Sequence, residues 1–190
     1  MPLRSTPEVA NSVIWLAWYV SWLLAALWRA RAAREPPKRT QITYRLLALS
    51  GVFMLFADVP PLDVQLWHLP VALQWPAVVV SFLGFAFTWW ARIHLGRFWS
   101  SNVGRKADHR IIDTGPYGIV RHPIYSGITL ASVATAVLRA TPGAWIGVAL
   151  LTIGWYVKAR LEERFLREEL GTGNYDAYAR RVPMLVPFTR

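Results

Sequence analysis

The chain has 190 residues, of which 54% are hydrophobic and 11 are Trp, and its formal net charge is +10. This composition is too apolar and too aromatic for an ordinary soluble domain, so we expect a single membrane-embedded domain over residues 1–190. The chain contains no Cys, which excludes a disulfide framework, a thiolate nucleophile and a Cys-based metal site. Its basic residues cluster at the borders of apolar segments, which favours contact with membrane lipids over nucleic acid binding.

The first apolar segment covers residues 12–28 and carries no charge, and its length is close to the roughly 20 residues of a spanning helix. Basic residues follow it directly, at Arg29, Arg31, Arg34, Lys38 and Arg39. A cleavable signal peptide carries its positive charge before the apolar segment, so this order predicts a retained helix instead. The positive-inside rule then places the N-terminus outside and the loop at residues 29–39 in the cytoplasm.

Four more apolar segments follow, at residues 46–57, 71–90, 124–138 and 144–157. The loop at residues 58–70 has no Lys or Arg, which suits an outside location. Alternation of about five transmembrane helices then places the C-terminus in the cytoplasm, and we expect a bacterial or archaeal inner membrane. The shorter segments have about 12 to 15 residues, too few for a bilayer core about 30 Å thick. They are expected either to extend into flanking turns or to form a hairpin that does not fully cross.

Polar residues gather in two blocks, at residues 96–122 and 158–190, which this topology places on the cytoplasmic side. Because the apolar segments contain almost no ionisable groups, we expect the function to lie in these blocks. The chain therefore divides into an N-terminal two-helix part at residues 1–70 and a catalytic part at residues 71–190.

The first polar block ends in the sequence GPYGIVRHPIYSG at residues 115–127. Its glycines and first proline are turn residues, and Pro123 fits the first turn of the following helix. His122 precedes a proline and is biased to an extended conformation, which displays it beside a helix N-terminus that attracts anions. A simpler alternative is that Arg121 anchors the helix at anionic headgroups and that His122 is a solvated neighbour of the cap.

The second polar block begins on a helix that is expected to continue from the fifth apolar segment. Glu163 and Arg167 lie one helical turn apart there and form an i,i+4 pair. Further along, Tyr175 and Tyr178 make a short aromatic segment that leads to Arg181. The alternatives are a solvated, salt-bridged helix followed by an amphipathic helix at the membrane interface.

Other chemistry finds little support in the sequence. The four histidines lack the spacing of metal ligands, so no metal site is predicted; they are His68, His94, His109 and His122. The sequence GTG at residues 171–173 follows a charged helix instead of a strand, so it does not predict a dinucleotide site.

The ordered set RHPxY, EE, YxxY and RVP, within about residues 95–188, resembles the isoprenylcysteine carboxyl methyltransferase family. That family belongs to a wider group of small integral-membrane methyltransferases, which includes the phospholipid N-methyltransferases. The resemblance implies an all-α membrane fold without a Rossmann domain, in which cytoplasmic loops and the C-terminal segment form a pocket for S-adenosylmethionine. It also implies methyl transfer at the cytoplasmic membrane face to a lipophilic acceptor, with O-methylation of a carboxylate of an isoprenylcysteine-like or other amphipathic substrate favoured.

The resemblance also implies the site residues. The cofactor-binding positions are Gly115, Tyr117, Arg121, His122, Tyr125, Glu162, Tyr175 and Tyr178. Arg181 matches an arginine that acts on the substrate carboxylate, and Glu163 is the second catalytic residue. Isoprenylcysteine enzymes tend to carry Glu inside the YxxY segment, whereas this chain has Ala177 with Asp176 beside it. This departure leaves the prenylcysteine substrate open.

Methyl transfer from a sulfonium to a carboxylate needs no strong acid or base, so positioning and exclusion of water must supply most of the acceleration. An Arg side chain can hold both carboxylate oxygens and fix the angle of attack. Three alternatives stay open: an NADPH-dependent membrane reductase of the sterol reductase type, a phospholipid N-methyltransferase, and a non-catalytic membrane protein with this fold. The acceptor and the oligomeric state are also open.

Overall fold

The computed structural model describes residues 5–26, 38–96, 112–170 and 172–189. Its α-helices are α1 (Thr6–Ala26), α2 (Lys38–Phe56), α3 (Val71–Leu95), α4 (Pro123–Arg139), α5 (Pro142–Leu170) and α6 (Thr172–Arg181), with a short 3-10 helix η2 (Gly115–Gly118). No strand occurs in the described ranges. The prediction of an all-α fold without a Rossmann domain is therefore confirmed for the part of the chain that the structure describes.

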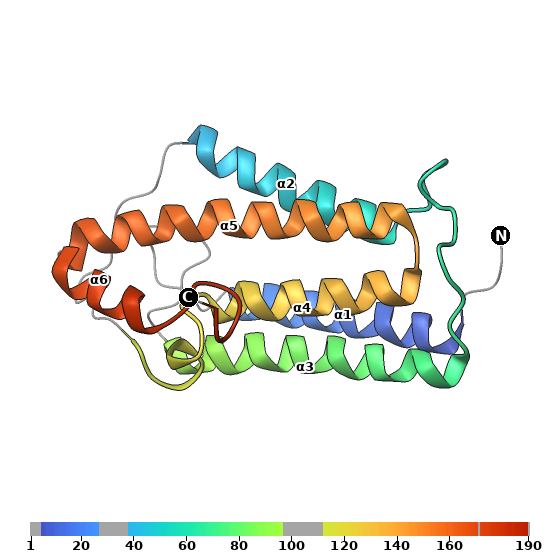
Figure 1. Cartoon of the computed structure of the whole chain (residues 1–190), viewed down its shortest axis with the longest axis horizontal. Coiled ribbons are helices and arrows are strands. Elements are labelled where there is room, and N and C mark those ends of the chain that lie inside the picture. Colours follow the sequence, from blue (N-terminus) through green and yellow to red (C-terminus); the bar gives the residue numbers. More distant parts are fainter. Residues whose placement is uncertain (1–4, 27–37, 97–111, 171, 190) are drawn as a thin grey trace.

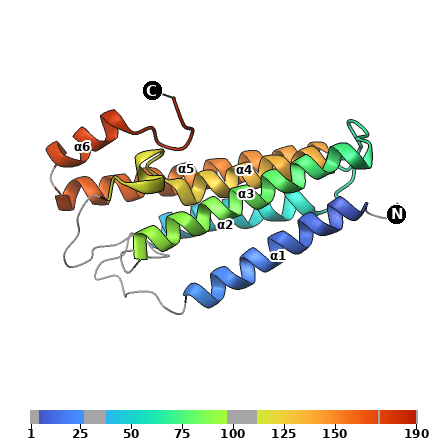
Figure 2. The ribbon, with the colours of Figure 1, turned by 90° about the horizontal axis from the view of Figure 1, so that it is seen from below.

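The first five helices run up and down in alternating directions (Figure 1). The main pairings are α3 with α4 and α2 with α5, while α1 packs chiefly on α3. Figure 2 shows α6 folded back over the end of α5, at the opposite end of the bundle from the start of α1. We call the end with α6 and η2 the site end, and the end with the α2–α3 loop and the α4–α5 turn the outer end.

Each predicted apolar segment corresponds to one helix, although residue 57 follows the end of α2 and residues 27 and 28 of the first segment lie outside the described ranges. The short segments belong to longer helices, since α2 begins at Lys38 and α5 continues to Leu170. By length and composition, α3 is the one helix among the described residues that is long and apolar enough to cross a membrane. The other four spans remain a prediction. Most of the loop predicted at 29–39 also lies outside the described ranges.

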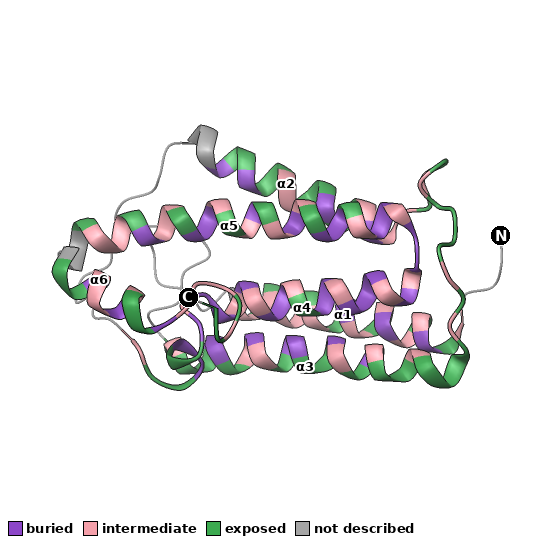
Figure 3. Cartoon of the chain, in the orientation of Figure 1, coloured by how far each residue is buried: buried purple, intermediate pink, exposed green. Residues whose placement is uncertain are grey.

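The surface of the bundle is apolar and its interior contains polar groups. Large apolar side chains, such as Leu16, Leu49 and Phe82, are exposed along α1, α2 and α3 (Figure 3). Ser81 and Thr88 are instead buried between helices, where they bond to main-chain carbonyl oxygens. This is the reverse of a water-soluble domain, and it fits a bundle whose sides face lipid.

Glycines set the closest approaches between helices. A Cβ atom on Gly84 of α3 would lie 2.6 Å from the carbonyl oxygen of Gly127 on α4. On the other pair, a Cβ atom on Gly147 of α5 would lie 2.6 Å from the backbone nitrogen of Leu55 and 2.7 Å from the carbonyl oxygen of Gly51. Small residues at such crossings let backbones touch, which is how helices associate where lipid removes the hydrophobic driving force.

We expect Gly147→Ala to lower the melting temperature of the detergent-purified protein by several degrees. The added methyl group meets the backbone of α2 and cannot be relieved by a rotamer change, and overpacking of this kind costs about 1–3 kcal/mol. Gly173→Ala is the matched control, because its Cβ meets no atom within 4 Å and Ala favours helix. Equal melting temperatures for the two variants would contradict the close crossing of α2 and α5.

Candidate active site

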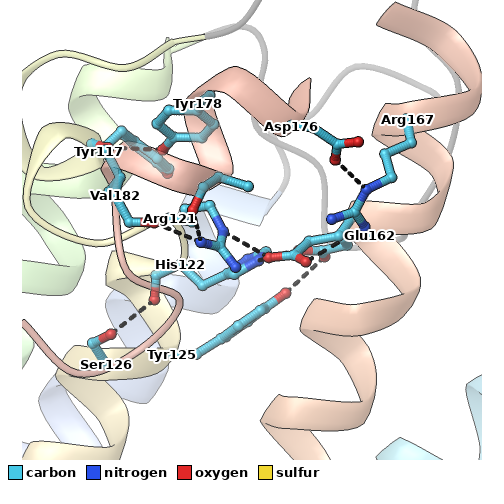
Figure 4. A network of polar contacts seen from close by, with 12 residues as sticks. Tyr117, Arg121, His122, Tyr125, Ser126, Glu162, Arg167, Asp176, Tyr178 and Val182 are labelled. Carbon is cyan, nitrogen blue, oxygen red and sulfur yellow. Dashed lines mark hydrogen bonds and ion pairs between the residues drawn. The ribbon is translucent and has the colours of Figure 1, made fainter. Parts of the chain in front are cut away.

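The sequence motifs come together at the site end, where η2, the start of α4, the polar end of α5 and α6 meet (Figure 4). As predicted, α4 begins at Pro123, and His122 is its N-cap residue with φ −124° and ψ 64°. Proline at the first helical position needs no N–H partner, so the helix starts directly after the His122 side chain. This side chain is therefore fixed beside the free N–H groups of the helix N-terminus.

Gly115 shapes the turn that precedes this helix. Its φ angle of +57° lies in the left-handed region, and a Cβ atom would lie 2.8 Å from the ring of His94. His94 Nε2 lies 2.9 Å from Thr114 Oγ1, within hydrogen-bond distance. The His94 ring stacks on the Tyr117 ring, with the two ring centroids 6.4 Å apart. Sequence reasoning missed His94 as a site neighbour, because its only signal was its place in an aromatic and basic border.

Two carboxylates enclose the His122 ring. Glu163 Oε1 is 3.3 Å from His122 Nε2, and Glu162 Oε2 is 3.5 Å from His122 Nδ1. The Glu163 side chain is 1% exposed, and its Oε1 also accepts a 2.8 Å hydrogen bond from Arg121 Nε. Glu162 accepts a 2.7 Å hydrogen bond from the Tyr125 hydroxyl. Because both ring nitrogens face an acid, the arrangement favours the doubly protonated imidazolium.

The charges of the cluster shift its pKa values in opposite directions. Burial by itself lowers the pKa of His122, but its contacts with Glu162 and Glu163 outweigh burial and raise it above the ordinary value. Burial by itself raises the pKa of Glu163, but His122 and Arg121 lower it to about 2. The pKa of Glu162 is also lowered, against burial, chiefly by His122. The cluster therefore favours one imidazolium between two carboxylates.

An aromatic stack supports the cluster from the bundle side. The His122 ring stacks on Tyr125 with centroids 5.6 Å apart, and Tyr125 stacks on Trp155 at 5.2 Å with an interplanar angle of 4°. Lys158 Nζ lies 5.4 Å from the centroid of the Tyr125 ring. Trp155 was not predicted, since a Trp inside an apolar segment gives no signal of a site.

The C-terminal segment is fixed to the start of α4 by hydrogen bonds to main-chain carbonyl oxygens. Arg121 donates from its side chain and its backbone N–H, His122 from its backbone N–H and Ser126 from its hydroxyl. The accepting carbonyls belong, in chain order, to Ala179, Val182, Pro183, Met184 and Leu185. We call residues 182–185 the C-terminal strap. Arg121 thus contacts Glu163, α6 and the strap at once.

The two predicted tyrosines of α6 are buried. Tyr178 donates a 2.7 Å hydrogen bond to the carbonyl oxygen of Tyr117 in η2 (Figure 4). Tyr175 is 1% exposed, and the Arg167 guanidinium carbon lies 5.0 Å from its ring centroid. Arg167 also donates a 2.8 Å hydrogen bond to Asp176. The acid beside Ala177 is therefore engaged with α5, a pairing that sequence reasoning did not predict.

Arg181 is the predicted site residue that lies apart from the buried cluster. Its side chain is 67% exposed, and its guanidinium is paired with Asp113 at 3.1 Å. The structure brings the other predicted residues together, either in the cluster around Glu163 or in the packing of α6 on η2.

Comparison with known proteins matches residues 77–168 to the isoprenylcysteine carboxyl methyltransferase (ICMT) family. The matched range holds His122, Tyr125, Glu162 and Glu163 and ends before α6.

Individual relatives extend the likeness beyond that range. Protein-S-isoprenylcysteine O-methyltransferase B of Arabidopsis thaliana is 31% identical over 137 residues, which cover 61% of this chain and 69% of the relative. Methanethiol S-methyltransferase 1 of Bradyrhizobium diazoefficiens is 31% identical over 173 residues, or 86% of this chain and 59% of the relative. A probable protein-S-isoprenylcysteine O-methyltransferase of Oryza sativa subsp. indica is 27% identical over 164 residues, which cover 79% of this chain and 83% of the relative.

Glu163→Gln is expected to lower the stability of the purified protein most strongly between about pH 4.5 and pH 6.5. The folded-state pKa of Glu163 lies below its ordinary value of 4.5, so its contribution is complete above that value and is lost as the pH falls toward 2. The folded-state pKa of His122 lies above its ordinary value of 6.5, so its contribution is complete below 6.5 and is lost as the pH rises through the raised pKa.

The measurement is the melting temperature against pH for the wild type and the variant. Glu168→Gln makes the same chemical change at an exposed position of α5, and we expect its melting temperature to stay close to that of the wild type at every pH. If the melting temperature of Glu163→Gln lies below that of the wild type by the same amount at every pH, ionisation of the buried groups does not contribute to stability.

Proposed function

The chain belongs to the isoprenylcysteine carboxyl methyltransferase family and is a methyltransferase, and we propose that it transfers a methyl group from S-adenosylmethionine to the carboxylate of a lipophilic acceptor. The observation that carries this proposal is the buried cluster in which His122 lies between Glu162 and Glu163. The cluster closes the bundle at the site end, beside the apolar surface, so a lipophilic acceptor can approach it from the bilayer.

Buried polar atoms at the site fit the cofactor. S-adenosylmethionine, when bound, supplies an electrophilic methyl group on a positively charged sulfur, and it also carries an ammonium group and ribose hydroxyls. Glu163 Oε2, which lies 3.7 Å from Arg167 Nη1, and the Tyr175 hydroxyl are buried and have no hydrogen-bond partner among the described residues. Leaving such an atom unpaired costs about 1–3 kcal/mol. A ligand with donors and acceptors would recover this energy, so Glu163 and Tyr175 are assigned to the cofactor together with Glu162, whose side chain is 23% exposed.

The protonation states of the cluster favour a carboxylate acceptor. A carboxylate is already nucleophilic at neutral pH, whereas a thiol or an ammonium must first lose a proton. The raised pKa of His122 favours its protonated form, which has no lone pair with which to act as a base. Glu162 and Glu163 are weak bases because their pKa values are lowered. The cluster therefore orients groups and excludes water, and it does not need to take a proton.

A thiol acceptor is the second candidate, and one residue favours it. Burial lowers the pKa of Lys158, although Glu162 opposes this shift, and a lysine moved toward neutrality is a potential base. The Lys158 ammonium lies beside Tyr125, within the aromatic stack under His122. The relative named a methanethiol S-methyltransferase aligns with most of this chain, and this likeness supports the same alternative.

Membrane topology completes the proposal. Besides α3, the apolar segments of α1, α2, α4 and α5 are assigned as spans, which gives five crossings with the N-terminus outside and the site end in the cytoplasm. The arrangement of the helices supports this, since α6 and the start of α1 lie at opposite ends of the bundle (Figure 1). Among the described residues, the charged cluster lies wholly at the site end.

The test is methyl transfer by the protein reconstituted in liposomes with S-adenosylmethionine labelled in its methyl group. The acceptors are an S-prenylcysteine with a free carboxylate, the same molecule as a carboxamide, a long-chain thiol and phosphatidylethanolamine. We expect transfer to the free carboxylate and none to the carboxamide. If only the thiol or only the amine becomes labelled, the methyl acceptor is that group and the proposal of a carboxylate acceptor is wrong. Calorimetric binding of NADPH without binding of S-adenosylmethionine would instead favour the reductase alternative.

Arg181→Ala is expected to lower the turnover number at least tenfold while the affinity for S-adenosylmethionine stays within a few fold. The exposed guanidinium is proposed to exchange Asp113 for the acceptor carboxylate, and charge-assisted hydrogen bonds of this type are worth about 1.5–3 kcal/mol. Arg180→Ala removes a neighbouring exposed arginine and serves as the control. Loss of cofactor affinity in Arg181→Ala would move this residue to the cofactor half of the site, and unchanged turnover would remove it from the site.

His122→Ala is expected to abolish measurable binding of S-adenosylmethionine in calorimetric titration, because the two carboxylates then lose their shared cation. Since this change also disturbs the fold, Tyr125→Phe provides a milder probe that keeps the aromatic stack and removes the hydrogen bond to Glu162. We expect about tenfold weaker cofactor binding for Tyr125→Phe. Full affinity in both folded variants would show that the cluster is not the cofactor site.

A further inference from the structure

A cavity lined by both polar and apolar side chains lies at the outer end of the bundle, at the opposite end from the catalytic cluster. It opens between the start of α1, the end of α2 and the end of α4, and its volume is about 220 Å³ including the part that is open to the surroundings. The lining residues are Glu8, Asn11, Ser12, Phe56, Thr135, Leu138 and Arg139. Nothing in the proposed methyl transfer uses these residues, so the cavity needs a separate explanation.

Two side chains that line the cavity each leave one buried polar atom without a partner. Asn11 is 2% exposed, and its Nδ2 donates a 3.1 Å hydrogen bond to Thr135, but its Oδ1 has no partner among the described residues. The Arg139 side chain is 10% exposed and pairs with Asp58 through Nη2, but its Nε has no partner there either. One helix thus offers an unused acceptor and another an unused donor, at the same cavity.

The hydrogen bonds of the neighbouring groups run to other atoms and leave both orphan atoms without a partner among the described residues. Thr135 Oγ1 already accepts hydrogen bonds from Asn11 and from Trp15 Nε1, and it donates to the carbonyl oxygen of Ala131. Glu8 accepts a 2.7 Å hydrogen bond from the backbone N–H of Ser5 at the start of α1. Since an unpaired buried polar atom is costly, a ligand that pairs both atoms stabilises the folded chain.

The charges around the cavity define the chemistry of that ligand. The Arg139 charge is already balanced by Asp58, so a bound anion would also face the carboxylate of Glu8. A bound cation would face the Arg139 guanidinium. A neutral hydroxyl avoids both conflicts, because its oxygen accepts from an N–H and its hydrogen points to a carbonyl oxygen. The enclosed part of the cavity is about the size of one water molecule, so it holds a single hydroxyl group and no larger polar group.

We propose that this outer cavity is a binding site for a hydroxyl group, which accepts from Arg139 Nε and donates to Asn11 Oδ1. The hydroxyl comes either from water or from the glycerol headgroup of a lipid, and both sources have the same chemistry. The bridge joins α1 to α4. These two helices have few direct contacts, since α1 packs chiefly on α3. The proposal is independent of the proposed function.

The test uses the full chain with ¹⁵N-labelled arginine, in liposomes of phosphatidylcholine or of phosphatidylglycerol, which differ in headgroup hydroxyls. Solid-state NMR detects magnetisation transfer to the Arg139 Nε–H from water protons or from lipid glycerol protons. The signal is assigned by its loss in Arg139→Lys. We expect transfer from water in phosphatidylcholine, and in phosphatidylglycerol either the same transfer or one from the glycerol, which identifies the source.

Asn11→Leu removes the acceptor and is expected to abolish the transfer, with methyl transfer activity retained as evidence of folding. Ser81→Ala is the matched control, because it removes a buried hydroxyl that lies away from the cavity and bonds to the carbonyl oxygen of Ala131. It should leave the transfer unchanged. The proposal is overturned if wild-type Arg139 Nε–H receives magnetisation from neither source, or if the transfer persists at full strength in Asn11→Leu.

Discussion

The buried carboxylate of Glu163 is the constraint on which the rest of the site depends. An ionised acid at this depth is costly unless several donors surround it. Arg121 and His122, at the start of α4, bond to one oxygen, and Arg167 of α5 lies 3.7 Å from the other. Arg167 in turn holds Asp176 of α6. A single charge therefore fixes the relative positions of three helices.

Different interactions stabilise the helix bundle and the site. Glycine crossings and buried hydroxyls hold the helices together without relying on the hydrophobic effect, which lipid cannot supply. The result is a rigid set of helix ends that presents ionisable groups where water is available. This division explains why charged side chains of the described chain can be concentrated at the site end while the sides of the bundle stay apolar.

Sequence patterns predicted the helices better than the contacts between side chains of different helices. The five apolar segments, the helix start at Pro123 and the gathering of His122 with the two glutamates follow from periodicity, proline geometry and motif resemblance. The stacking of Trp155 under Tyr125 could not be predicted, because a Trp in an apolar segment looks the same whether it faces lipid or a site. Spacing also could not reveal that Arg121 and Arg181, both basic residues in short motifs, differ so strongly in burial. Tertiary packing decides which arginine is enclosed by carbonyl groups.

The C-terminal strap has a further consequence for how this chain can vary. Its contacts with α4 use main-chain carbonyl oxygens of residues 183–185, which every amino acid possesses. Mutational drift at those three positions therefore leaves the attachment intact, provided that the backbone path is kept. The two side-chain donors have no such freedom, since only particular side chains can replace the guanidinium of Arg121 or the hydroxyl of Ser126. The backbone N–H groups of Arg121 and His122 need only a residue other than proline. These hydrogen bonds therefore depend on the side chains of Arg121 and Ser126 and not on those of the strap.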